Sequence, residues 1–256
     1  MNMKRLARAL LPAPLVTRIA AQRARRHSHR LNREWGVARL SERLLDELGA
    51  AVVAGPFAGL VLPRAAAAEH LGPYLLGTYE RELHPYWTAL APGTVPRIVN
   101  IGAKVGYYAV GLSRLLEAPA VAFDADPWAR RVLKATVRLN RADVTIRRAC
   151  TRGDLEDLPA GTLVMVDCDG CEELLLRDPL PSGLLRSRLV VELHGALVGD
   201  DATAARLGRT HEVRGVPTEP APAPPAVLDF LDAHERKLAV EELRPLQRWL
   251  LCTPRT

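Results

Sequence analysis

Two apolar runs in the second half of the chain are followed by side chains that can take up a proton. Asp167 and Asp169 follow the run TLVMV, and Glu192 and His194 lie at the end of RLVVELH. A carboxylate or an imidazole beside a hydroxyl can remove its proton near neutral pH. We therefore name Asp167, Glu192 and His194 as candidate catalytic groups, with Asp167 first. Two structural alternatives stay open, because Asp167 could cap a helix and ELH could simply end a strand.

The same four side chains could instead hold a divalent cation that orients and acidifies a hydroxyl. No ligand spacing in the sequence is diagnostic of such a site, and we predict no metal. The motif Cys168-x-x-Cys171 lacks the second CxxC or the His pair of a zinc site. Four cysteines are too few for a disulfide scaffold in 256 residues, so we expect reduced thiols at Cys150, Cys168, Cys171 and Cys252.

A glycine-bounded turn separates an apolar run from an amphipathic segment in RIVNIGAKVGYYAVGLSR, residues 97–114. Gly102 permits a sharp bend, and Gly106 permits a ligand to approach the free N–H groups at the start of a helix. The spacing G-x-x-x-G differs from that of nicotinamide and flavin sites, and Lys104 lacks the hydroxyl neighbour of a Walker loop. Asp124 follows Gly102 by 22 positions, a spacing at which a carboxylate reaches ribose hydroxyls. These signals predict a site for a nucleoside without phosphates.

The candidate groups must be positioned by an alternation of strands and helices that begins near residue 97. Such an alternation specifies an α/β fold, with a Rossmann-like, doubly wound, mostly parallel sheet and helices on both faces. Ligands of such sheets bind beyond the carboxyl ends of the strands, where the strand order reverses. Strands are predicted at 97–102, 120–125, 144–150, 162–168 and 188–194, and helices at 107–117, 127–141, 154–158, 171–178 and 200–208.

The remaining sequence divides into a basic helical N-terminal extension, residues 1–50, and the domain itself, residues 51–256. Within the domain, VPTEPAPAPP is too rich in proline to enter the sheet, so 215–225 is expected to be a proline-rich loop. The other elements predicted are two short strands within 50–63, a loop and helix within 71–90, a last helix at 227–238 and a last strand at 247–254.

Most of the positive charge lies near the N-terminus, where residues 1–45 hold eleven Lys and Arg residues against Glu34 and Glu42. We expect a solvated helix there. Weak contact with a membrane surface or a nucleic acid through this segment, or a transit peptide, are the alternatives. No apolar run approaches eighteen residues, and Arg8 and Pro12 interrupt any signal-peptide core. The expectation is a cytoplasmic protein, and the sequence does not predict its oligomeric state.

The motifs quoted above resemble those of a known family. VNIGAKVGYYAVGLSR followed by VAFDADP is similar to motifs I and II of class I S-adenosylmethionine-dependent methyltransferases, over about residues 75–200. LVMVDCDGCEELLL resembles the fourth-strand signature of FkbM-type members, and RLVVELH resembles their fifth strand. The positions that match the fourth-strand signature are Asp167, Asp169, Gly170 and Glu172.

The resemblance implies the cofactor S-adenosyl-L-methionine, with Asp124 on its ribose and the loop after Cys150 near its adenine. Asn100 stands where an acidic residue is commoner in the family, and its amide oxygen can still accept from the cofactor's ammonium group. Lys104 and Val105 replace the small or acidic residues often seen there. The cofactor-binding residues implied are Asn100, Gly102, Ala103, Gly106, Tyr107, Tyr108, Asp124, Ala125, Thr151 and Arg152.

The aromatic segment GTYERELHPYW precedes the first predicted strand. It is expected either to pack on the sheet edge or to form a lid, in which Tyr79, Glu80 and His84 touch the cofactor or the acceptor, with Asp169 also on the acceptor side. The function expected is O-methylation of a small-molecule or glycan-type hydroxyl. A nucleic-acid methyltransferase and a degenerate cofactor-binding scaffold stay open as alternatives, although no N/D-P-P-Y/F motif for exocyclic amino groups is present.

Overall fold

The computed structural model describes residues 26, 30–32, 34–168, 170–193, 199–244 and 247–255, with the backbone alone for 199–201. Three of the sequence predictions therefore lie wholly or largely outside the described residues. These concern Asp169, His194 and most of the basic segment before residue 34.

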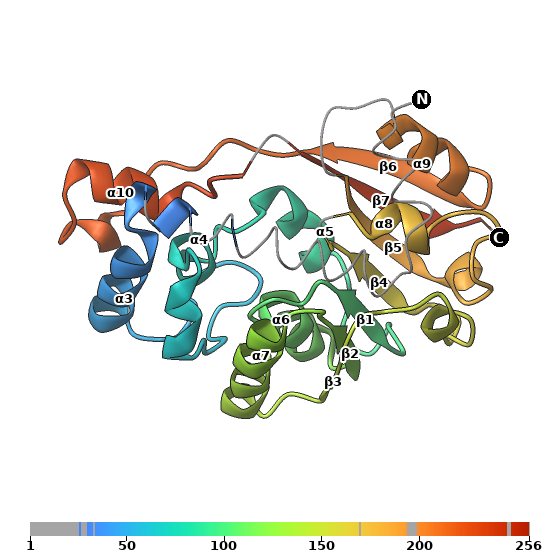
Figure 1. Ribbon diagram of the computed structural model, residues 1–256, viewed down its shortest axis with the longest axis horizontal. Coiled ribbons are helices and arrows are strands. Elements are labelled where there is room, and N and C mark those ends of the chain that lie inside the picture. The colour runs from blue at the N-terminus through green and yellow to red at the C-terminus, as the bar shows by residue number, and fades with distance from the viewer. Residues whose placement is uncertain are drawn as a thin grey trace.

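Over the described residues, seven strands form one sheet in the order β3-β2-β1-β4-β5-β7-β6 (Figure 1). The first five strands run parallel to their neighbours, whereas β7 runs antiparallel to both β5 and β6. The chain thus winds outward in both directions from the central pair β1 and β4. The strands are β1 Ile98–Ile101, β2 Ala120–Phe123, β3 Val144–Arg147, β4 Leu163–Val166, β5 Arg188–Leu193, β6 His211–Pro217 and β7 Arg248–Pro254.

This strand order, with an antiparallel β7 between β5 and β6, is that of the class I methyltransferase fold. The predicted Rossmann-like α/β class is confirmed. All four residues of β1 and all four of β4 are buried, as an apolar run covered on both faces of a parallel sheet requires.

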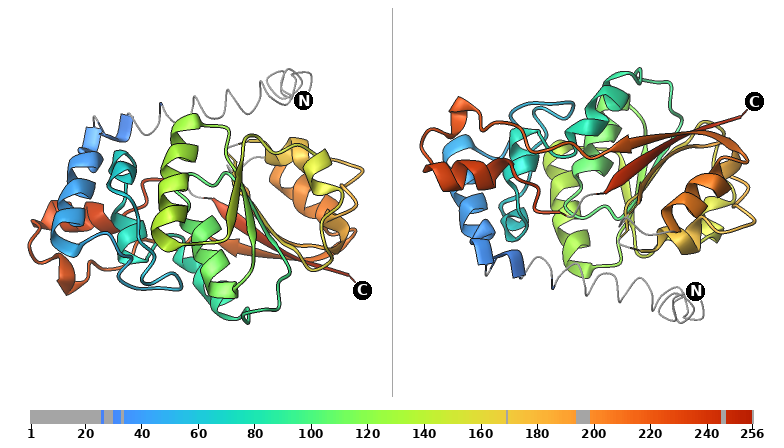
Figure 2. Two further views of the ribbon diagram at one scale, coloured as in Figure 1. Left: turned by 90° about the horizontal axis from the view of Figure 1, so that it is seen from below. Right: turned by 90° about the horizontal axis from the view of Figure 1, so that it is seen from above.

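Helices cover both faces of the sheet, and two hydrophobic clusters fill the space beneath them (Figure 2). Along β1, Ile98 belongs to one cluster and its neighbour Val99 to the other, because successive side chains of a strand point to opposite faces. The first cluster includes residues of α6 and α7, and the second includes Leu175 of α8 and Leu207 of α9. The α-helices are α3 Val37–Leu48, α4 Gly72–Leu76, α5 His84–Thr88, α6 Tyr107–Leu116, α7 Pro127–Asn140, α8 Glu172–Leu175, α9 Gly199–Leu207 and α10 Ala233–Val240. The 3-10 helices are η1 Arg64–Ala68, η2 Arg81–Leu83, η3 Gly153–Leu155, η4 Leu184–Arg186 and η5 Ala226–Leu228.

Beyond one end of the sheet, α3, α4 and α10 pack together and bring distant parts of the chain side by side (Figure 1). Arg43 of α3 forms an ion pair with Glu235 of α10 at 2.6 Å and donates to the carbonyl of Phe230 at 2.7 Å. The α10 helix belongs to the long connection between β6 and β7. The chain must therefore return from this end toward β7, and it carries Glu242 and Arg244 with it.

The proline-rich stretch corrects one prediction. Val216 and Pro217 do enter the sheet, where they end β6 and pair with Trp249 and Arg248 of β7. A proline is tolerated there because β6 is an edge strand and Pro217 is its last residue. The rest of the stretch lies outside the strand, and β6 itself had not been predicted.

Two further predictions are wrong in detail. Among the described residues, 50–63 forms an isolated antiparallel bridge between Ala51 and Val61 in place of two strands. The segment 71–90 contains the two short helices α4 and α5, with η2 between them, in place of one helix. Among the helices that the structure describes, none is long and apolar enough to cross a bilayer.

Candidate active site

The glycine turn between β1 and α6 lies where the strand order reverses, and it packs directly on the end of β4. Gly102 has φ of 89°, and the carbonyl oxygen of Asp167 lies 1.6 Å from the position that a Cβ would occupy. Gly106 caps α6 with φ of 91°, and a Cβ there would meet the Leu133 side chain of α7 at 2.6 Å. At both glycines, the atoms that leave no room for a Cβ thus belong to other parts of the same chain. Lys104, between them, also has a positive φ of 43°.

Asp124 holds this turn against the end of β2. Its two carboxylate oxygens accept from the backbone N–H groups of Lys104 and Asp126, each at 2.8 Å. Burial raises the pKa of Asp124, and these two hydrogen bonds oppose that rise. Each oxygen retains a second lone pair, so the carboxylate can both shape the turn and accept from a ligand hydroxyl.

A pocket opens beside the turn, between β1, the end of β4 and the start of α6. Two polar atoms in it are buried and have no hydrogen-bond partner among the described residues, namely Asn100 Oδ1 and the Tyr107 hydroxyl. Such orphaned buried groups are rare in folded proteins and call for a partner. The pocket is lined by Tyr74, Tyr79, Asn100, Gly102, Ala103, Lys104, Val105, Tyr107, Tyr108 and Asp167.

Four of the chain's five tyrosines form one wall of this pocket. The ring centroids of Tyr74 and Tyr79 are 4.1 Å apart, and those of Tyr74 and Tyr107 are 5.0 Å apart in an edge-to-face arrangement. Burial raises the pKa of Tyr107 and Tyr108, so both remain neutral hydroxyls. Tyr74 was missed by the sequence reasoning, because the aromatic segment singled out there begins after it.

Arg244 sits among four carboxylates behind this wall. Its guanidinium lies 2.7 Å from Glu82, 2.6 Å from Glu242, 3.3 Å from Glu192 and 3.6 Å from Glu80. Burial opposes the charge of Arg244, yet the surrounding carboxylates raise its pKa. We call these five residues the Arg244 cluster. Sequence reasoning missed Arg244, since the residues it contacts are as many as 164 positions away, at Glu80.

Glu80 connects the Arg244 cluster to the pocket. Its Oε2 accepts from the Tyr108 hydroxyl at 2.5 Å, and its backbone N–H donates to Glu242 at 2.9 Å. Burial, together with the charges of Asp167 and Glu242, raises the pKa of Glu80 to about 8, although Arg244 acts in the opposite direction. Of the residues predicted to form a lid, Tyr79 therefore lines the pocket and Glu80 lies behind its wall.

His84, the third predicted lid residue, has a structural contact. It is half-buried, its Nε2 lies 3.2 Å from the carbonyl oxygen of Tyr79, and burial lowers its pKa. Glu192, predicted as catalytic, is buried at the end of β5 with its carboxylate on Arg244.

The two residues predicted to approach the adenine are engaged in the loops that they belong to. Thr151 bonds to Asp154 through both its backbone N–H, at 2.9 Å, and its hydroxyl, at 2.6 Å. Arg152 donates to the carbonyls of Leu175 and Arg177 after α8, and also to that of Pro179. Ala125, between Asp124 and Asp126, is partly exposed.

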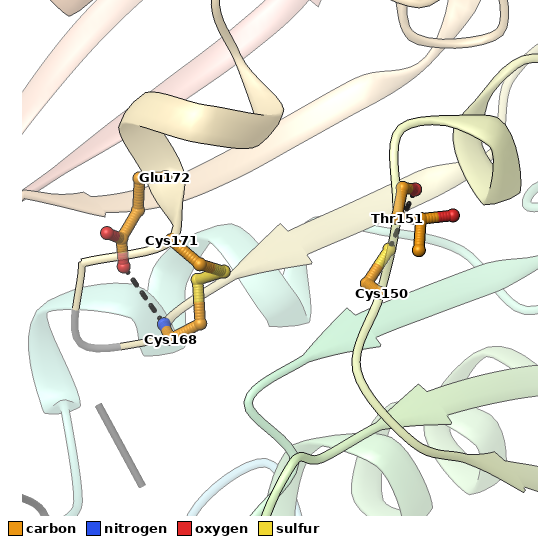
Figure 3. Close-up of a disulfide and its surroundings, with 5 residues drawn as sticks. All are labelled: Cys150, Thr151, Cys168, Cys171 and Glu172. Atoms are coloured by element: carbon orange, nitrogen blue, oxygen red, sulfur yellow. Dashed lines mark hydrogen bonds between the residues drawn. A yellow bond between two sulfur atoms is a disulfide. The ribbon is translucent and has the colours of Figure 1, made fainter. Parts of the chain in front are cut away.

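The loop after β4 carries a disulfide between Cys168 and Cys171, which corrects the expectation of reduced thiols (Figure 3). The tight turn brings the two Cα atoms within 5.5 Å, a separation that suits a disulfide. The Cys168 N–H also donates to Glu172 Oε1 at 2.9 Å. Cys150 and Cys252 are buried and unbonded, as expected. The prediction of reduced thiols was based on the small number of cysteines. The close spacing of Cys168 and Cys171 was the feature that indicated a bond.

No group of three or more His, Cys, Asp or Glu side chains within the described ranges is arranged to hold a metal ion. His194 and Asp169, two of the four side chains considered as ligands, lie outside those ranges.

No family model matches the chain, and neither does any curated protein sequence. Solved structures do resemble it. Precorrin-6y C5,15-methyltransferase from Geobacter metallireducens is 13% identical with a TM-score of 0.48, and the match covers 71% of this chain and 90% of that one. A putative O-methyltransferase from Klebsiella pneumoniae is 16% identical with a TM-score of 0.44, over 84% of this chain and 90% of that one. TrmN from Thermus thermophilus is 15% identical with a TM-score of 0.46, over 70% and 48%. With likenesses this distant, the fold assignment rests on the strand order described above.

Proposed function

We propose that the chain is an S-adenosyl-L-methionine-dependent methyltransferase. The observation that carries the proposal is the pocket at the carboxyl ends of β1 and β4, with the orphaned acceptors Asn100 Oδ1 and Tyr107 hydroxyl in it. Ligands of doubly wound sheets bind where the strand order reverses. The resemblance of the glycine turn and of VAFDADP to methyltransferase motifs points to the same ligand.

The groups at the pocket suit this cofactor in kind, although the ligand-free cavity is only about 10 Å³ in volume and has to open to admit it. Asn100 Oδ1 can accept from the ammonium of the methionine part. Asp124 does not line the ligand-free pocket, but its remaining lone pairs, beside the turn, can accept from the ribose hydroxyls. The tyrosine wall can face the positive sulfonium, since aromatic faces attract cations. Neither Gly102 nor Ala103 presents a bulky side chain to the pocket they line.

We infer that the acceptor is a hydroxyl of a small molecule or a glycan. Methyl transfer is an in-line displacement, so the protein has to align the acceptor and remove its proton. Asp167 is the pocket-lining carboxylate at the end of β4 and is the first candidate for that base. His194 and Glu192 remain candidate bases on the sequence argument, and Asp169 remains a candidate residue on the acceptor side. FkbM-type membership and a cytoplasmic location also remain predictions from the sequence, as does attachment through residues 1–45.

Calorimetry with S-adenosylmethionine, its demethylated product, NAD and ATP tests the cofactor assignment. The first two should bind at micromolar or lower concentrations, and NAD or ATP should bind more weakly. Asn100→Ala should weaken binding of both cofactor forms by about 1–3 kcal/mol, because it removes a hydrogen bond to a charged group. Ser113→Ala is the matched control, since Ser113 is also buried but bonds within α6 and its flank. Equal or tighter binding of NAD would reject the assignment.

A mass-shift screen with labelled cofactor tests the acceptor. Hydroxylated metabolites and glycans form one arm of the screen, and transfer RNA and DNA form the other. Labelling confined to nucleic acid would overturn the hydroxyl proposal and support the nucleic-acid alternative.

A further inference from the structure

The charge around the pocket points to a ligand preference that can be measured without any acceptor. We propose that Glu80 makes the pocket selective for a positively charged ligand, so that the sulfonium donor binds more tightly than its neutral thioether product. The proposal rests on the proposed function, because it concerns the cofactor of that same site.

Glu80 lies directly behind the pocket wall. Its side chain is 1% exposed, and its carboxylate accepts from the hydroxyl of Tyr108, which lines the pocket. Its neighbour in the sequence, Tyr79, also lines the pocket. The second carboxylate oxygen, Oε1, has no hydrogen-bond partner among the described residues. The Glu80 backbone has a positive φ of 48°, a conformation that costs free energy for a non-glycine residue and is concentrated at functional sites.

Of the four carboxylates in the Arg244 cluster, Glu80 lies farthest from the guanidinium. One guanidinium serves four carboxylates, and it approaches Glu82 and Glu242 within 2.7 Å but Glu80 only within 3.6 Å. Asp167, on the pocket side, adds a further carboxylate that acts on Glu80. An ionised Glu80 therefore leaves negative charge beside the pocket in surroundings that screen it poorly.

The pocket offers groups that suit a cation. Asn100 Oδ1 and the Tyr107 hydroxyl are buried there without a partner, and Asn100 Oδ1 can only accept. Tyrosine rings form one wall, and the negative face of an aromatic ring attracts a cation. These groups suit a cation, but the donor and the product both carry the ammonium that Asn100 can bind, so only the charge at sulfur distinguishes the two ligands.

S-adenosylmethionine and its product are suited to testing the preference for a positive charge, because they differ in charge at the sulfur atom. When the methyl group leaves with its bond to sulfur, the S–CH3 bonding electrons stay on the sulfur, and the sulfonium becomes a neutral thioether. The rest of the molecule is unchanged. A pocket that favours positive charge at that position holds the donor and releases the product after transfer.

The protonation state of Glu80 couples to this preference. The pKa of Glu80 lies near 8 in the ligand-free protein, so near pH 7.5 the carboxyl is largely protonated. A cation in the pocket favours the ionised form, and binding must then release a proton. The titratable groups that interact electrostatically with Glu80 are Tyr74, Tyr79, Tyr107, Tyr108, Asp167, Glu242 and Arg244. Glu82 and Glu192 share Arg244 with it.

The experiment is calorimetry of the full chain with S-adenosylmethionine and with its product, at pH 7.5 in buffers of different ionisation enthalpy. We expect the donor to bind at least tenfold more tightly than the product, with proton release on donor binding and much less on product binding. The preference should grow between pH 7 and pH 9. Glu80→Gln should reduce the preference about tenfold, leave product affinity within threefold, and abolish the difference in proton release.

Glu82→Gln is the matched control, because Glu82 is equally buried in the Arg244 cluster but its charge is met by Arg244 at 2.7 Å. It should change the preference by less than threefold. Equal or tighter binding of the product by the parent protein would overturn the proposal, as would equal losses for both ligands in Glu80→Gln. Failure of both ligands to bind would instead reject the proposed function, and this inference with it. Where Glu80→Gln does not fold, absence of proton release on donor binding by the parent protein overturns the proposal.

Discussion

The carbonyl oxygen of Asp167 fills the space beside Gly102, 1.6 Å from the position of an added Cβ. This contact joins the turn after β1 to the end of β4, the two elements that frame the pocket. The requirement for glycine at residue 102 is therefore set first by the packing of one strand end against another. The contact favours ligand binding indirectly, because it holds the turn and Asp167 in one arrangement.

Gly102→Ala should consequently both destabilise the protein and impair cofactor binding. A positive φ costs a residue with a Cβ about 1 kcal/mol, and the clash with the Asp167 carbonyl should raise the total above about 3 kcal/mol. Gly93→Ala is the matched control, since Gly93 also has a positive φ of 73° but nothing lies within 4 Å of its Cβ position. Chemical denaturation of both variants gives the comparison. Equal destabilisation would show that the contact is unimportant.

The sheet and the glycine turn were predictable because both are local in the sequence. Leu163 to Val166 is an unbroken apolar run, and Ile98 to Ile101 is apolar except for Asn100; all residues of both strands are buried. The β6 strand was not predictable in the same way, since most of its residues are exposed or partly exposed and it ends in Pro217. An edge strand needs no continuous apolar run.

The candidate site was predictable where it depends on strand ends and not where it depends on distant packing. Gly102 and Asp167 follow strands of the predicted pattern and line the pocket, as does Asn100, which only the family resemblance had indicated. Arg244 comes to the site only because the chain leaves the sheet after β6, forms α10 and returns. No local pattern around Arg244 indicates that path, and three of the four carboxylates that it contacts, at Glu80, Glu82 and Glu192, lie far away in the sequence.

The Arg244 cluster predicts how stability depends on pH. The pKa values of Glu80 and Glu242 are raised from 4.5 to about 8 and about 7, mainly because burial disfavours their ionised forms. The unfolded chain loses these protons near pH 4.5, whereas the folded protein keeps them to higher pH. The stability contributed by the protonated forms of Glu80 and Glu242 is thus fully present below pH 4.5 and is lost as the pH rises to about 8.

Melting temperatures measured between pH 5 and pH 9 check this dependence. Glu242→Gln should flatten the decline, because glutamine has no proton to lose. Glu117→Gln, at an exposed position, should leave the decline as it is in the parent protein. A parent protein whose stability rises over this range would contradict the assignment.

The disulfide predicts a definite thiol count. The denatured, unreduced protein should react with two equivalents of thiol reagent, at Cys150 and Cys252, and the reduced protein with four. Cys168→Ser should cost at most about 2 kcal/mol, because the loop closed by the bond is very short. Four reactive thiols before reduction would show that the bond is absent in the isolated protein.

The N-terminal segment divides into a part that should be dispensable for cofactor binding and a part that should not. Deleting residues 1–25 should leave cofactor affinity within twofold, because every described residue that lines the pocket comes later in the chain. Deleting residues 1–45 would also remove Val37, Leu40 and Leu44 from the core, at about 1.5–3 kcal/mol for each buried side chain. Calorimetry and melting curves separate the two effects. Salt-sensitive binding to anionic vesicles, lost in the shorter deletion, would identify an attachment segment.

The last prediction concerns Asp167, which we expect to serve the acceptor more than the cofactor's binding energy. Its backbone N–H bonds to Ile101 of β1 at 2.9 Å, so the residue follows β4 at the point where the two central strands end together. Asp167→Asn keeps the size of the side chain and removes its basicity. If the carboxylate takes the acceptor's proton, transfer should fall by about 10²–10⁴-fold while cofactor affinity changes by less than threefold.

Asp178→Asn, at an exposed carboxylate paired with Arg209, is the control and should retain full activity. Kinetics with the acceptor found in the labelling screen, together with calorimetry, provide the measurement. Activity of Asp167→Asn within a few-fold of the parent would move the base to His194 or leave positioning as the role of Asp167. Activity that depends on added Mg²⁺ and disappears with a chelator would instead make Asp167 a metal ligand, because a bound cation can acidify the acceptor without a protein base.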